Sequence, residues 1–200
     1  NGIASLNKEI QLFNIACRIT RRISHHLQSN EWQAIQAFLA QLTATLEKLE
    51  PGSREPEEIH HAKGWIREFE AELAWAHFGL GREYVHHLRL KFYSDDIFPE
   101  YPDYNEDVLP ILRLMENIRP DVITCAIDPE GSGPDTHYKS LMALSAAVDE
   151  YVKSTGRTDI RIWGYRNVWS RFSVDEANTI IPVSLNSMAV LHNMFNSCFL

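Results

Sequence analysis

Long hydrophobic runs and an excess of basic residues are both missing from this sequence. No apolar run approaches the roughly 18 residues of a membrane span, and no signal-peptide pattern opens the chain. The 19 lysines and arginines are outnumbered by 27 aspartates and glutamates, so the formal net charge is -8. Nucleic acids and anionic membranes select basic surfaces, so we expect neither as a partner. An anionic small molecule held by a few local arginines remains compatible with this composition.

Cysteine is scarce as well. Cys17, Cys125 and Cys198 lie far apart and form no CxxC pair. Cys125 falls in an apolar run, where a cysteine is most simply a small core residue. This usage is typical of a reduced, cytoplasmic protein.

The two ends of the sequence have an unusual pattern. Residue 1 is Asn rather than Met, and residues 194–200 continue an apolar helical pattern without a stop signal. We therefore expect this chain to be a piece of a longer protein.

The stretch from Asp121 to Lys139 organises the rest of the chain. Its apolar run, residues 122–127, predicts a buried strand, and a loop with two glycines and two prolines follows it. Asp135, Thr136 and His137 then lead into a long amphipathic segment. A strand, a loop and a helix start place polar side chains at the carboxyl edge of a sheet, where open α/β folds bind ligands.

Two helices are predicted before this stretch, over residues 5–29 and 31–49, because apolar residues recur there at steps of three and four. They form a helical hairpin within residues 1–56, interpreted as an insertion or an inter-domain element. The sequence also contains two pairs of adjacent histidines, His25-His26 and His60-His61. Adjacent side chains on a helix point in different directions, so neither pair is suited to bind one metal ion.

Helices and strands alternate through residues 57–200, which predicts one α/β domain there. The fold class is a Rossmann-like, doubly wound, mostly parallel sheet with an N-terminal helical hairpin, incomplete in this chain. Helices are expected over 57–78, 105–117, 137–153 and 184–200, strands over 84–92, 122–127, 160–165 and 179–183, and a binding loop or lid over 93–105.

Asp135 and His137 are the main candidates for chemistry. A histidine at a helix start, with Asp128 and Asp135 nearby in sequence, has the parts for a metal ligand or a general acid/base. The alternative is structural, with Asp135 capping the helix and His137 an ordinary first-turn residue.

Three further residues are weaker candidates for contacts with a substrate. Arg67 stands three residues before Glu70, which fits either an ordered site edge or a surface ion pair. Tyr165 and Arg166 follow a predicted strand, where they suit a sugar hydroxyl or an anion, or else form an aromatic turn.

In order, these segments resemble the PIG-L/LmbE family of zinc-dependent N-acetylglucosamine-type deacetylases, in the version fused to glucosamine-6-phosphate deaminase-like proteins. The resemblance covers about residues 62–200. Its matching segments are Ile66 to Ala71 (family R-x-x-E-A), Gly79, Val85 to Tyr93, Arg119 to Val122, Gly133 to His137 (family H-P-D-H), Tyr165 to Trp169 and Ile181 to Ser184.

The resemblance implies a metal-dependent hydrolysis of an N-acetyl amide on an amino sugar. His137 would be a metal ligand, Asp135 a catalytic residue that orients it, and Arg67, Tyr165 and Arg166 substrate contacts. Zinc would be the cofactor of the complete domain, with none expected in this fragment. An amino sugar or sugar phosphate would be the small-molecule partner, and a deaminase domain could share the parent chain.

The sequence departs from the family at two positions. The family's P-H-P-D-D motif occurs nowhere in the 200 residues and would normally precede residue 1, and Pro134 stands where the first histidine of H-P-D-H falls. One histidine is too few for catalytic zinc, which usually has three protein ligands. A competing hypothesis is therefore a non-catalytic, degenerate deacetylase-like domain that binds sugar phosphate or packs on a deaminase. A third is a helical interaction module over residues 5–50 that forms a homo-oligomer.

Overall fold

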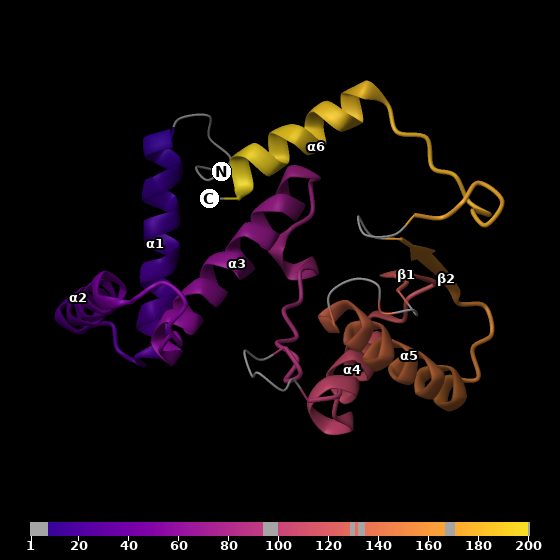
Figure 1. The fold of residues 1–200 in the computed structure, drawn as a ribbon, viewed down its shortest axis with the longest axis horizontal. Helices are drawn as coiled ribbons and strands as arrows, with labels where there is room; N and C mark the ends of the chain where they lie inside the picture. Colours follow the sequence, from indigo (N-terminus) through magenta and orange to yellow (C-terminus); the bar gives the residue numbers. More distant parts are fainter. Residues whose placement is uncertain (1–7, 94–99, 129–130, 132–134, 167–170, 200) are drawn as a thin grey trace. The chain divides into compact units, whose positions relative to one another are not determined.

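The computed structural model describes residues 8–93, 100–128, 131, 135–166 and 171–199. Helices dominate it, with one small parallel sheet (Figure 1). The chain divides into two compact units, the first made of residues 1–87 and 182–200 and the second of residues 88–181. The predicted boundary between residues 56 and 57 stays a prediction.

The first unit is helical. It contains α1 (Lys8–His26), α2 (Trp32–Lys48), α3 (Glu57–His77), the short 3₁₀ turn η2 (Arg82–Tyr84) and α6 (Leu185–Cys198). The starts and ends of these helices agree with the predicted ranges to within a few residues. Gly79 has a φ of +82° just after α3, and Ser184 accepts a hydrogen bond from the Ser187 amide at the start of α6, as their residue types suggest.

Apolar side chains from three helices form the core of the first unit. Ile15 of α1, Phe69 and Leu73 of α3, and Met194 and Cys198 of α6 are all buried together. A second contact joins α1, α2 and α3 through aromatic rings: the His26 ring lies 5.7 Å from that of Phe38, 5.3 Å from that of His61 and 5.2 Å from that of Trp65. His26 of the first adjacent pair and His61 of the second therefore both pack their rings in this contact.

The second unit contains the sheet. Its elements are the π-helical turn η3 (Tyr104–Val108), α4 (Leu109–Ile118), β1 (Val122–Ala126), α5 (Asp135–Thr155) and β2 (Arg161–Tyr165). The strands pair in parallel, from Val122 opposite Arg161 to Ala126 opposite Tyr165. Parallel neighbours need a crossover, which α5 supplies. The predicted β-α-β order of this segment is therefore confirmed.

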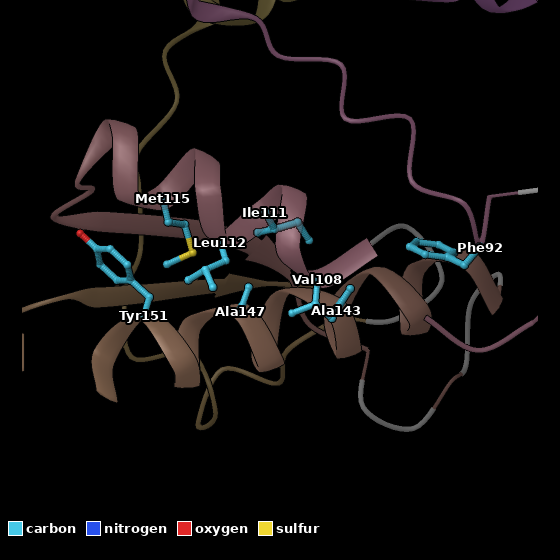
Figure 2. Close-up of a cluster of buried hydrophobic side chains, with 8 residues drawn as sticks. All are labelled: Phe92, Val108, Ile111, Leu112, Met115, Ala143, Ala147 and Tyr151. Carbon is cyan, nitrogen blue, oxygen red and sulfur yellow. The ribbon is translucent and has the colours of Figure 1, made fainter. Parts of the chain in front are cut away.

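The core of the second unit lies between α4 and α5 (Figure 2). Ala143, Ala147 and Tyr151 recur every four residues and so form one stripe along α5. The two alanines leave room for Leu112 and Met115 of α4. The sequence pattern predicts a buried side made of Leu141, Leu144, Val148, Tyr151 and Val152. Tyr151 is buried as predicted, whereas the other four are only partly buried, because the alanines take the closest positions.

Two predicted strands are wrong. Residues 84–92 contain the end of η2, then backbone without a paired strand and a turn at Lys91 and Phe92, and Arg89 has a φ of +51°. Residues 179–183 are also unpaired, and the Ile180 side chain is 80% exposed. The alternation over residues 84–92 and the β-branched composition of residues 179–183 satisfied a local pattern, but a strand needs a neighbour for its N–H and C=O groups. In the part of the chain that the structure describes, the sheet has two strands rather than a doubly wound set.

One buried carboxylate fixes the segment between η2 and α4. Asp107, 1% exposed, accepts hydrogen bonds from the amide of Phe92 (3.1 Å) and the amide of Asp103 (2.8 Å). The Phe92 amide directly precedes the predicted binding loop over 93–105, and the Asp103 amide lies within it; residues 94–99 of the loop lie outside the described part of the chain. Asp107 therefore ties Phe92 and Asp103 to η3.

Candidate functional site

The carboxyl ends of β1 and β2 coincide. Ala126 is opposite Tyr165, and one residue further the amide of Ile127 still donates a hydrogen bond to the Tyr165 carbonyl, at 2.8 Å. The residues that follow the two strands, Asp128 and Arg166, therefore leave the sheet at the same edge. Parallel strands in register bring together side chains that are 38 positions apart along the chain, and this edge is the candidate site.

The residues after β1 and β2 have contrasting environments. Asp128 is 5% exposed, so its carboxylate is part of the interior rather than of the solvated surface. Arg166 is half-buried, and its guanidinium lies 5.3 Å from the centre of the Phe172 ring. The Tyr165 side chain is 55% exposed. A cation backed by an aromatic ring beside an exposed phenol could bind an anion or a sugar hydroxyl.

The start of α5 supplies the rest of the site. Asp135 is the first residue of the helix, and His137, half-buried, lies in its first turn. Lys139 Nζ lies 2.5 Å from Asp135 Oδ2, and the Lys139 side chain is only 3% exposed. The Tyr101 ring lies 5.7 Å from the same ammonium. Asp135 is therefore bound to a lysine, and its predicted role as an orienting partner of His137 stays a prediction.

Lys139 is the residue that sequence reasoning missed. It stands four residues before Ala143 and so continues the buried stripe of α5. A lysine on a core-facing stripe, with an aspartate one turn earlier, is a signal readable from sequence, because a buried ammonium needs a partner.

Arg67 lies in the first unit, whereas the other four predicted site residues lie in the second. Its side chain is 71% exposed, and Nη1 lies 2.6 Å from Oε2 of Glu70, whose side chain is 1% exposed. The (i, i+3) ion pair suggested by the sequence is present, and it satisfies a buried carboxylate. A contact between Arg67 and a substrate stays a prediction.

The described residues do not fit a zinc ion. Within the ranges that the structure describes, no three His, Cys, Asp or Glu side chains are grouped so that they could hold a metal. The Lys139 ammonium also occupies an oxygen of Asp135, the carboxylate closest in sequence to His137. Residues Gly133, Pro134 and 167–169, which belong to the family-like segments, lie outside the described residues.

The fold and this edge define a class: a mainly helical α/β chain with a polar site at the end of a parallel strand pair. The chain is distantly homologous to a Bacteroides thetaiotaomicron protein named "Putative glucosamine-6-phosphate deaminase-like protein", with 28% identity over 170 residues. The match covers 82% of this chain and 25% of that protein, so the chain spans about a quarter of the relative's length. No protein-family model matches the chain. No solved structure matches it either.

None of the helices that the structure describes has both the length and the apolar composition to span a membrane.

Proposed function

We propose that the carboxyl edge of β1 and β2 binds a phosphorylated amino sugar in a cytoplasmic protein of amino-sugar metabolism. The observation that carries the proposal is the strand register, which ends both strands at Ala126 and Tyr165 and so gathers Asp128, Arg166 and the start of α5. The distant homology to a glucosamine-6-phosphate deaminase-like protein supports the choice of ligand class.

Each group at this edge has a role in the proposal. Arg166 would bind the phosphate, since guanidinium groups match phosphate oxygens with paired hydrogen bonds. The amino-terminal end of α5 adds a partial positive charge. Tyr165 and His137 would contact sugar hydroxyls, and the buried Asp128 would accept a hydrogen bond from the ligand's ammonium or hydroxyl groups.

The test is a titration of the chain with glucosamine 6-phosphate. Binding is measured by isothermal titration calorimetry and by the NMR signals of the backbone amides. Replacing Arg166 with Gln removes a charge-assisted contact, so we expect a loss of affinity of about tenfold or more. Arg171→Gln, an exposed position five residues further on, is the charge-matched control and should leave the affinity unchanged. Equal losses for both variants, or no binding by the unmodified chain, would overturn the proposal.

The deacetylase implied by the PIG-L/LmbE resemblance is the second candidate. The position of His137 in the first turn of α5, directly after the loop that follows β1, favours it. On this hypothesis the complete protein has a full Rossmann-like sheet, and metal ligands beyond His137 come from residues other than the described ones. Arg67 would then be a substrate contact, and a deaminase domain a neighbour in the same parent chain.

Two observations separate these candidates. A His-Pro-Asp-Asp segment encoded upstream of Asn1 in the natural gene would favour the deacetylase, and its absence from the full-length protein would remove that candidate. Zinc content is the second observation. If the full-length protein and its His137→Ala variant contain equal zinc, His137 is not a ligand and the binding function is favoured.

A further inference from the structure

Helix α6 of the first unit presents an apolar face to solvent. Met194 and Cys198 are its buried residues, and every residue from 185 to 193 is exposed. Large apolar side chains at steps of three and four form a stripe along the exposed side of α6 and its C-cap, called here the α6 stripe. Its members are Leu185, Met188, Leu191, Phe195 and Phe199, with exposed fractions from 36% to 88%.

The sequence around α6 is uncharged. Charged residues make up 23% of the chain, yet residues 177–200 contain no Asp, Glu, Lys or Arg. A solvated helix normally carries such residues on its outer face, where they form ion pairs one turn apart. On α6 the rings of Phe195 and Phe199 instead stack 5.4 Å apart while 53% and 41% exposed. Contiguous apolar surface of this kind marks an interaction site.

The first half of α6 has little local support for its helical conformation. Its cap is present, since the Ser184 hydroxyl accepts a hydrogen bond from the Ser187 amide at 3.1 Å. After the cap, residues 185–193 have neither charged side chains for ion pairs nor buried apolar ones. Short helices without such contacts are marginal in water, and α6 is 14 residues long. The stripe therefore needs a partner surface.

We propose that the α6 stripe is an interface within a longer polypeptide, covered by an uncharged apolar element of the same polypeptide that lies outside residues 1–200. The length of the relative supports this occupant, because the present chain spans only about a quarter of it. A lipid surface suits the stripe less, since helices that lie on membranes are rich in Lys and Arg on their polar face and α6 has neither.

The first test uses methionine oxidation in the full-length, unmodified protein. The four methionines of the chain form a natural series: Met188 is 51% and Met142 37% exposed, whereas Met115 and Met194 are each 6% exposed. N-acetylmethionine amide in the same solution reports the rate of an unprotected side chain. We expect Met188 to lose its reactivity and to oxidise no faster than Met194. Faster oxidation of Met188 than of both buried methionines would overturn the proposal.

The second test identifies what covers the stripe. Phe195→p-benzoylphenylalanine keeps an aromatic ring in the stripe of the full-length protein and cross-links to its neighbours under light. We expect links within one polypeptide to residues outside 1–200. The control is the same photoreactive residue at Asn193, an exposed position on the opposite side of α6. It should give few of these links.

Three cross-linking results would overturn the proposal. Links only to a second copy would make the stripe a homodimer interface, and links only to residues within 1–200 would mean that this chain covers it. Equal links from positions 195 and 193 would mean that the stripe has no specific partner. None of these results bears on the sheet edge, because it belongs to the other compact unit.

Discussion

Replacing Asp107 with Ala tests how the predicted binding loop is held. The Asp107 carboxylate accepts hydrogen bonds from the amide of Phe92 in the interior and the amide of Asp103 in a half-buried position. The substitution leaves two amides without an acceptor, and each costs about 1–3 kcal/mol when water cannot replace the partner. Water can reach the Asp103 amide in part, so we expect the second unit to lose about 2–4 kcal/mol of stability.

Native-state hydrogen exchange measures this loss by region. The opening free energy of amides in α4 and α5 should fall by the stated amount, and the Phe92 amide should lose its protection altogether. Asp107→Asn should be nearly as harmful, because its NH₂ group faces an amide that also donates. Glu106→Ala, an exposed position in the same turn, is the control and should change stability by less than about 0.5 kcal/mol. A fall of under about 1 kcal/mol for Asp107→Ala, with Phe92 still protected, would refute the reasoning.

Three other predictions concern the second unit. Ala147→Leu puts a large side chain at a position with 0% exposure between α4 and α5, and we expect about 1–3 kcal/mol of destabilisation by urea unfolding. Gly164→Ala brings a Cβ into the side chain of Ile127, so the unfolding midpoint should fall or the Ile127 methyl resonances should shift. The hydrogen bond from Arg157 lowers the pKa of Asp159 in the folded chain. This hydrogen bond therefore stabilises the folded chain above the ordinary aspartate pKa, and the stabilisation is lost as the pH falls through the lowered pKa of Asp159. When unfolding is measured as a function of pH, the free energy of unfolding of the Asp159→Asn variant should fall less over this acidic range.

Local patterns were sufficient to predict the elements that satisfy their own backbone groups. Helix α3 ends near a glycine with positive φ, and α6 starts at a serine cap, because caps depend on residues within one turn. The pair β1 and β2 was also predictable, since β1 is a short apolar run, β2 is a short run rich in strand-forming residues, and the helix between them has the length of a crossover. The edge that carries Asp128 and Arg166 follows from these two strands.

The remaining features depend on contacts that no local pattern encodes. Residues 84–92 have a strand-like alternation, but the Phe92 amide is bound by a side chain 15 positions away rather than by a neighbouring strand. The ion pair of Arg18 with Glu72 joins α1 to α3 across 54 positions of sequence, in helices that also share a buried core.

Lys139 distinguishes between the two proposed functions of the sheet edge. An alanine at this position would continue the stripe of Ala143 and Ala147 without the cost of removing an ammonium from water. The ion pair with Asp135 offsets that cost, but a pair of this kind rarely stabilises a fold more than apolar packing does. A ligand with negative charge would gain from an ammonium held at this edge, whereas a metal ion on Asp135 would have to displace the ammonium and then be repelled by it. The buried lysine therefore favours anion binding over metal-dependent hydrolysis at the start of α5.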